Sequence, residues 1–185
     1  MRHTWDTWAP VIVPALTALP FAALAAWALA VWRGSWRTAL CDVAMVVGTV
    51  PWVWMILSPN GSGRSLTLVP FTDIPDQIFG GTSLLVEQIG GNLLVFAALG
   101  FCLPVRWAWF GRWWRILLVG VAGSVTVEAL QYALSIGRHS SVDDVLVNGV
   151  GALLAGLCSR RWWQTRSANV APGGYRGRPW SEHSR

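Results

Sequence analysis

The sequence predicts an all-α protein, a multi-pass bundle of about five membrane-spanning helices. Its 185 residues are 54% hydrophobic and only 12% charged, whereas a soluble domain carries about 25% charged residues. The apolar residues form runs of the length that crosses a bilayer. All 14 basic residues are arginines, and they lie between these runs and in the tail, which is a topology signal rather than a nucleic-acid footprint.

The first two helices are expected at residues 11–32 and 39–57. The first run is too long for a signal-peptide core, so we interpret it as a retained transmembrane helix. Pro14 and Pro20 are expected to kink it. Asp42, near the start of the second helix, is interpreted as an interfacial ion-pair partner of the nearby Arg37.

A long connection, residues 58–87, follows the second helix. Its first residues, SPNGSG, end regular structure. The stretch LTLVPFTDIPDQIFGG mixes apolar and polar residues, which indicates a loop that re-enters the membrane surface or an interfacial half-helix. Asp73 and Asp76 are assigned to a solvated loop, and no β-strand is expected in the chain.

Three further helices are expected at residues 84–105, 116–134 and 145–158. The last has only about 14 residues, short of the ~20 that span a bilayer, so it must borrow neighbouring residues such as 142–144. The tail after it is polar, Gly-rich and basic, and is expected to be disordered. The predicted units are an N-terminal helix and basic loop (1–37), a membrane domain (38–158) and a basic cytoplasmic tail (159–185).

The arginines predict the orientation, because cytoplasmic loops are enriched in basic residues. Arginines follow the first, third and fifth predicted helices, so these segments are expected to be cytoplasmic. Five spans, with the N-terminus outside and the C-terminus inside, satisfy every segment. The arginines concerned are Arg33 and Arg37, then Arg106, Arg112 and Arg115, and finally Arg160, Arg161 and Arg166.

Polar residues of the predicted spans converge on the outer side. Glu128 and Gln131 are three residues apart and share a helix face, while Asp144 and Asn148 open the last helix. Ionisable groups inside a membrane cost about 2.5–3.5 kcal/mol on insertion scales and need partners. Arg138 is the nearest cation for the carboxylates. The intramembrane or boundary candidates are Asp42, Glu87, Asn92, Glu128, Gln131, Asp143, Asp144 and Asn148.

Four motifs in order resemble the VanZ-like family of bacterial membrane proteins. They are LVPF, GNLLVFAALGF, VEALQ and GRHSSVDDVLVNGVGALLAG, within about residues 66–156. Ala98 departs from the family pattern, which often has proline there. The matching positions are Pro70, Phe71, Asn92, Phe96, Gly100, Glu128, Gln131, Arg138, Asp144, Asn148 and Gly151.

The resemblance implies a multi-pass helical protein of the bacterial cytoplasmic membrane. The family is named after an accessory protein of glycopeptide resistance, but it supplies no reaction. We therefore expect an outward-facing polar pocket that binds a lipid headgroup or an amphiphilic, glycopeptide-type compound. The pocket residues would be Asn92, Glu128, Gln131, Arg138, Asp144 and Asn148, with Arg138 contacting an anionic group.

Three alternatives stay open. In the first, the polar residues serve only as interhelical glue, at around 0.6 kcal/mol per hydrogen bond, and in the second they form the assembly surface for a membrane partner. The third is an enzyme acting on lipid-linked substrates, with Glu128 or Asp144 as acid or base. His139 lies four residues before Asp143, but a catalytic triad built from Ser140 or Ser141 with these neighbours is disfavoured, because triads depend on spatial placement.

The sequence indicates no cofactor, no metal site and no nucleic-acid partner. It contains no HExxH motif. Its cysteines, Cys41, Cys102 and Cys158, lie far apart in apolar runs without a CxxC motif, and are interpreted as small buried hydrophobes. The oligomeric state leaves no signal in the sequence.

Overall fold

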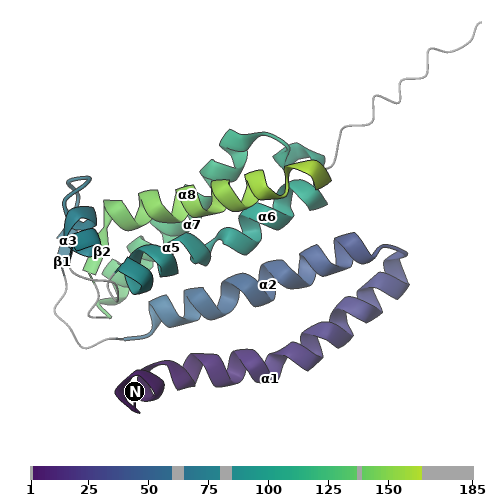
Figure 1. The fold of residues 1–185 in the computed structure, drawn as a ribbon, viewed down its shortest axis with the longest axis horizontal. Coiled ribbons are helices and arrows are strands. Elements are labelled where there is room, and N and C mark those ends of the chain that lie inside the picture. The colour runs from purple at the N-terminus through teal and green to yellow at the C-terminus, as the bar shows by residue number, and fades with distance from the viewer. Residues whose placement is uncertain (1, 60–64, 80–84, 137–138, 164–185) are drawn as a thin grey trace, which may run out of the picture.

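A computed structural model describes residues 2–59, 65–79, 85–136 and 139–163, and it is a bundle of long helices (Figure 1). The described chain is helical almost throughout, which confirms the all-α prediction. The helices are α1 (Arg2–Arg33), α2 (Trp36–Leu57), α3 (Asp73–Phe79), α5 (Gly91–Val95), α6 (Ala97–Arg106), α7 (Trp113–Leu134) and α8 (Val142–Cys158), with a π-helical turn η1 (Leu85–Gly90), 3-10 turns η2 (Ala108–Phe110) and η3 (Arg160–Trp162), and strands β1 (Ser65–Thr67) and β2 (His139–Ser141).

Four helical segments of the described chain are long and apolar enough to cross a membrane. They correspond to the first four predicted spans: Ile12–Arg33, Trp36–Leu57, Gln88–Arg106 and Trp113–Leu134. α1 continues as one helix through all three of its prolines. α8 has 17 residues and begins at Val142, so it takes in the residues it was expected to borrow. At 1.5 Å per residue it is about 26 Å long. The count of five spans and their orientation stay predictions.

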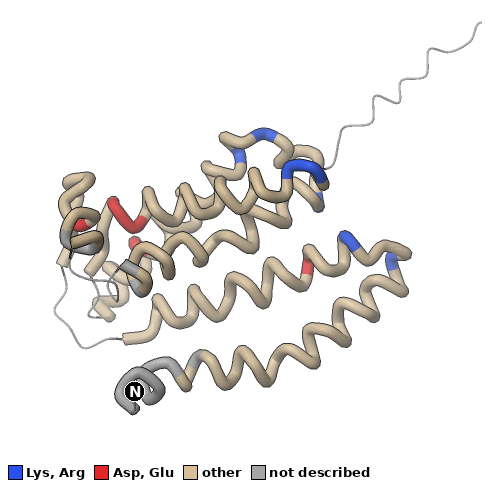
Figure 2. The backbone as a smooth tube through the Cα atoms, viewed as in Figure 1, with Lys and Arg blue, Asp and Glu red and all other residues tan. Residues whose placement is uncertain are grey.

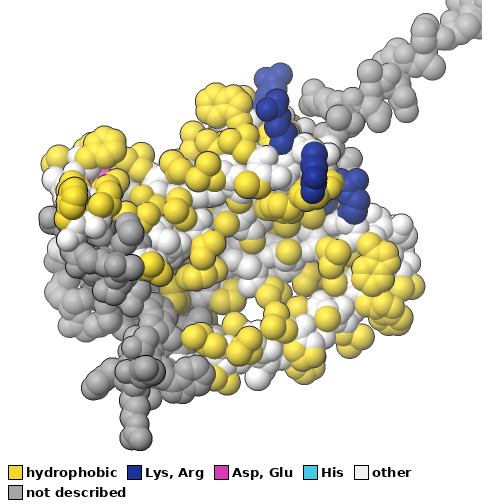
Figure 3. All heavy atoms as spheres, in the orientation of Figure 1, with side chains coloured by type: hydrophobic (Ala, Val, Ile, Leu, Met, Phe, Trp, Pro, Cys, Tyr) yellow, Lys and Arg dark blue, Asp and Glu magenta, His cyan; other side chains and the backbone are white. Residues whose placement is uncertain are grey.

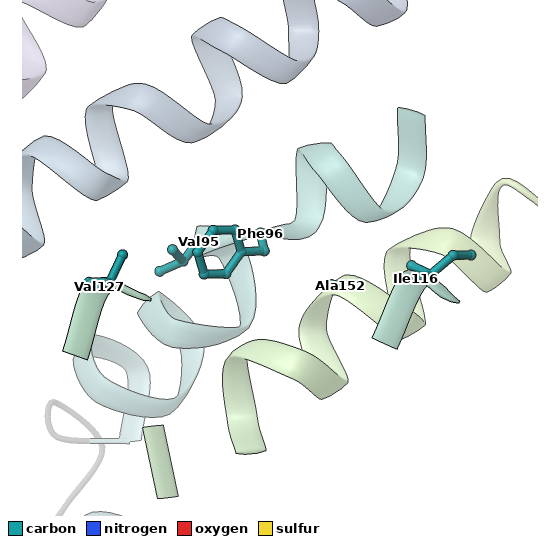
Figure 4. Close-up of a cluster of buried hydrophobic side chains, with 5 residues drawn as sticks. All are labelled: Val95, Phe96, Ile116, Val127 and Ala152. Atoms are coloured by element: carbon teal, nitrogen blue, oxygen red, sulfur yellow. The ribbon is translucent and has the colours of Figure 1, made fainter. Parts of the chain in front are cut away.

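α8 lies at the centre of the bundle, against α7 on one side and α5 and α6 on the other. α2 packs on α6, and α1 packs on α2 at the edge of the molecule (Figure 1). A small core joins these helices, formed by Val95, Phe96, Ile116, Val127 and Ala152 (Figure 4). Many apolar side chains of α1 and α2 remain exposed, and Figure 3 shows such side chains over much of the surface. This is the pattern of helices whose surroundings are lipid rather than water.

Glycines let α8 approach its neighbours closely. A Cβ atom on Gly100 would lie 2.0 Å from the Ala152 carbonyl oxygen, and one on Gly151 would lie 2.1 Å from the Leu93 carbonyl oxygen. Both contacts are with backbone, which cannot move aside as a flexible side chain can. Small residues at helix contacts are typical of membrane bundles, where close backbone approach replaces the hydrophobic driving force.

The third span is interrupted at Phe96, between α5 and α6. Phe96 has φ −110° and ψ 11°, outside the helical region, and its carbonyl accepts a hydrogen bond of 2.9 Å from the Gly100 N–H. The buried ring occupies the space beside Gly123, where a Cβ atom would lie 2.8 Å from it. The helix is therefore interrupted at Phe96 although this chain has Ala98 where the VanZ-like pattern often has proline.

Two short strands contradict the expectation that the chain has none. β1 and β2 pair in parallel, with Ser65 opposite His139 and Thr67 opposite Ser141. Each strand has three residues, fewer than the four to eight over which an alternating pattern can be recognised. The pair ties the connection after α2 to the start of α8.

Candidate functional site

The start of α8 fastens the preceding connection to the bundle. The side chain of Asp143 is fully buried, and its carboxylate accepts backbone N–H bonds from Phe71 (2.6 Å), Asp73 (2.9 Å) and Ile74 (3.2 Å). Ser141 caps the helix by accepting the Asp143 N–H at 3.1 Å. Asp143 was only a boundary candidate in the sequence, yet it organises this region.

Pro70 and Phe71, the motif residues of this loop, are exposed. Phe71 has φ 65°, the left-handed region that aromatic residues rarely adopt. Such a conformation costs about 1–3 kcal/mol and persists when its surroundings hold it. The hydrogen bond to Asp143 holds it here, so the motif positions backbone rather than filling the core.

His139 connects β1, β2 and α3 through its ring. Its Nδ1 lies 2.7 Å from Ser65 Oγ, and its Nε2 lies 3.0 Å from Asp73 Oδ2. Ser141 Oγ also donates to Asp73. Burial opposes ionisation of Asp73, but the hydrogen bonds from Ser141 and His139 hold its pKa below the ordinary value.

This network corrects two interpretations of the sequence. Asp73 does not belong to a free solvated loop, because the paired strands bring it to a residue 66 positions later. The serine whose hydroxyl contacts the His139 ring is Ser65, 74 positions earlier, and not the adjacent Ser140 or Ser141. Only the tertiary fold could place these groups together.

Three of the predicted pocket residues meet beside this network, from three different helices. The Asn92 side-chain amide donates to Asp144 Oδ1 at 2.5 Å. Glu128 on α7 interacts electrostatically with Asp144, and its backbone carbonyl accepts a hydrogen bond of 3.4 Å from the Ser140 hydroxyl. Within the described residues, its buried Oε2 has no hydrogen-bond partner. We call Asn92, Glu128 and Asp144 the carboxyl cluster.

Gln131 and Asn148 join helices instead of completing that cluster. Gln131 Nε2 donates to the Ile56 carbonyl of α2 at 3.0 Å, and Asn148 Nδ2 donates to Ser124 Oγ of α7 at 2.8 Å. Both side chains are buried. Each keeps a buried carbonyl oxygen that finds no partner in the described part of the chain.

Arg138 lies outside the described residues, as do the side chains of Asp76 and Glu87. The predicted contact between Arg138 and the carboxylates is therefore not described. Gly151 and Gly100, by contrast, lie at the helix contacts of α8, and Phe96 lies in the core.

Figure 2 shows most of the described acidic residues at one end of the bundle and the described arginines at the other. Asp42 is the exception, because it pairs with two of the arginines. We call the end with the carboxyl cluster and the strands the polar end, and the other, at residues 33–37, 106–115 and 159–163, the Arg-rich end. There Asp42 pairs with Arg33 and with Arg106, the latter at 2.9 Å. Arg37, its predicted partner, instead donates to the Trp162 carbonyl at 2.7 Å.

No group of three or more metal-ligating side chains occurs within residues 2–59, 65–79, 85–136 and 139–163. Cys41 and Cys102 are buried, as expected, but Cys158 is exposed. The described residues thus place no metal centre at either end.

A family model described as VanZ/LLP1 matches residues 39–163, more than half of the chain. No curated protein and no solved structure matches this chain.

Proposed function

The chain belongs to the VanZ/LLP1 family, and from this premise we propose that it is a multi-pass protein of the bacterial cytoplasmic membrane whose polar end binds a lipid headgroup or an amphiphilic compound. The carboxyl cluster carries the proposal, because three helices bring polar side chains together where each costs free energy in lipid. The distribution of arginines supports an outward-facing polar end.

The unpaired atoms favour one chemistry for the ligand. The buried oxygens without partners in the described chain belong to Glu128, Gln131 and Asn148, and also to Thr49 within α2. A buried polar atom left unpaired costs about 1–3 kcal/mol. A headgroup that donates hydrogen bonds, through an amine or hydroxyl groups, would satisfy the oxygen of Glu128 beside Asp144. The proposed ligand therefore presents hydrogen-bond donors to Glu128. This differs from a ligand recognised only through an anionic group bound by Arg138, which would need no donors.

Phosphatidylethanolamine and phosphatidylcholine provide a direct test in detergent. Their headgroups carry the same charge, but only the primary ammonium of the former donates hydrogen bonds. We expect phosphatidylethanolamine to raise the melting temperature of the wild type, and a diglucosyl lipid to do so if hydroxyl groups suffice. Glu128→Gln should lose this shift, whereas Asp42→Asn, which alters a carboxylate at the Arg-rich end, should keep it. Equal shifts with both phospholipids would refute donor recognition.

A second candidate function rests on the Ser65–His139–Asp73 contacts. Asp73 beside Nε2 favours the tautomer with hydrogen on Nε2, which leaves Nδ1 to accept the Ser65 proton. Ser65 Oγ would then attack the carbonyl carbon of a lipid ester, and the His139 proton would pass to the departing alcohol. Water would hydrolyse the acyl-serine and release the acid. These three residues, rather than Glu128 or Asp144, would carry the chemistry.

Labelling with a fluorophosphonate distinguishes this candidate. The reagent forms a covalent bond to an activated serine oxygen and releases fluoride. Labelling of the wild type that disappears in Ser65→Ala and in His139→Asn would support a hydrolase. An unlabelled wild type, or labelling that persists in Ser65→Ala, would reject it without affecting the proposal of headgroup binding.

A further inference from the structure

A cavity of about 470 Å³ lies at the Arg-rich end, between the start of α7 and the end of α8. Its volume falls within the range of small-molecule sites, about 300–1,000 Å³. It lies at the far end of α8 from the carboxyl cluster, so it is separate from the site proposed above. Its lining includes Arg112, Trp113, Trp114, Leu157, Arg160 and Trp163.

The cavity carries two positive charges without a matching carboxylate. Arg112 and Arg160 are exposed, and neither pairs with an acidic side chain in the described part of the chain. Asp42, the acid described at this end, already pairs with Arg33 and Arg106. Figure 2 shows the arginines gathered here, and Figure 3 shows several of them on the visible surface. An anion would complement the two guanidinium groups, each of which can donate several hydrogen bonds.

The rest of the lining is apolar and aromatic. Trp113 is 57% exposed, Trp114 41% and Leu157 41%. Tryptophan is enriched at membrane interfaces, where its ring lies at headgroup level. A small hydrophilic anion would use the arginines alone, whereas a lipid would place its phosphate at the arginines and its chains along the apolar face.

We propose that this cavity binds the phosphate headgroup of an anionic phospholipid, held by Arg112 and Arg160 between the tryptophan side chains. Basic pockets between transmembrane helices on the cytoplasmic side are suited to such headgroups. Bound there, the lipid bridges residues 111–114, before and within the first turn of α7, to the end of α8. It therefore joins the two helices at the end opposite the carboxyl cluster.

Native mass spectrometry of the full chain, released from detergent containing equal amounts of phosphatidylglycerol and phosphatidylcholine, tests the proposal. We expect the wild type to retain phosphatidylglycerol in at least fivefold excess, and the double variant Arg112→Gln/Arg160→Gln to lose the excess. Arg161→Gln is the matched control, because Arg161 lies in the same turn, stacks over Trp162 at 4.2 Å and does not line the cavity. Its excess should be unchanged.

Two further arms keep the result interpretable. Arg112→Lys/Arg160→Lys keeps both charges and should keep most of the excess, which separates a charge effect from damage to the fold. Inorganic phosphate at millimolar concentration should not displace the lipid. An excess that survives the double glutamine substitution would overturn the site, and displacement by inorganic phosphate would overturn the assignment to a lipid. Neither outcome bears on Glu128.

Discussion

Substitution of Asp143 should detach the loop around Phe71 while leaving the helices packed. Its Oδ2 accepts two backbone N–H groups and its Oδ1 accepts one. In Asp143→Asn, one oxygen can keep the two bonds to Asp73 and Ile74, but the amide nitrogen then faces the Phe71 N–H. Loss of one hydrogen bond to a charged group costs about 1.5–3 kcal/mol. At 1.4 kcal/mol per tenfold change in an equilibrium constant, the loop should open about 10 to 100 times more often.

Amide hydrogen exchange measures this opening directly. Peptides covering residues 68–79 should exchange about 10 to 100 times faster in Asp143→Asn, while peptides from α2 and α7 keep the wild-type rate. Asp42→Asn, at the other end of the bundle, should leave the loop unchanged. Wild-type exchange in Asp143→Asn, or acceleration spread evenly over all helices, would refute the reasoning that Asp143 specifically fastens this loop.

Three other perturbations follow from the packing and the polar network. Alanine at Gly100 or Gly151 must push backbone apart, so either variant should lower the free energy of unfolding by about 1–3 kcal/mol in a reversible unfolding measurement. Alanine at Gly91, where nothing lies within 4 Å of the added atom, should leave it unchanged or raise it by up to about 1 kcal/mol. Equal losses at all three sites would contradict the close-contact explanation. At Phe71, glycine should leave loop exchange near the wild-type rate and isoleucine should accelerate it, because only glycine adopts φ 65° readily; the reverse order would show that the exposed ring matters more than the backbone. The folded pKa of Asp73 lies below its ordinary 3.8, so its contribution to loop attachment is present above that pH and is lost as the pH falls through the folded value. Amide hydrogen exchange in the loop, corrected for its intrinsic pH dependence, should therefore become faster on acidification below about pH 4. Asp73→Asn should remove this pH dependence.

The helices could be predicted because each leaves a long signal in the sequence. An apolar run of about 20 residues has few interpretations, and the described segments Trp36–Leu57 and Trp113–Leu134 extend the predicted ones by three residues at the N-terminal side. The break at Phe96 and the three-residue strands leave no comparable signal, because both depend on contacts between distant segments. The close approach of α8 to its neighbours uses glycines, since small residues spaced along one helix allow backbones to come together in lipid.

The candidate site was predictable in part. The predicted orientation of the helices placed Asn92, Glu128 and Asp144 on the same outer side. In the structure Asn92 donates to Asp144, and Glu128 interacts electrostatically with Asp144. Gln131 lies three residues after Glu128 on the same face of α7, but its side chain donates to the Ile56 carbonyl of α2. Spacing along one helix does not specify which neighbouring helix each side chain contacts.

The contacts of Asp143 and His139 were not accessible in this way. Their partners lie 66 to 74 positions away, across a connection without a strong pattern. Two adjacent acids at a helix start were the available signal for Asp143, since carboxylates favour that end of the helix dipole. That signal gives no indication that the side chain would accept backbone hydrogen bonds from a distant loop.

The lipid content of the purified protein tests the central proposal most directly. Wild type and Glu128→Gln would be exchanged into detergent with equal amounts of phosphatidylethanolamine and phosphatidylcholine, and the retained lipids counted by native mass spectrometry. Donor recognition at the carboxyl cluster predicts an excess of phosphatidylethanolamine on the wild type and none on Glu128→Gln. Equal retention of the two lipids by the wild type, or the same excess on both proteins, would contradict it.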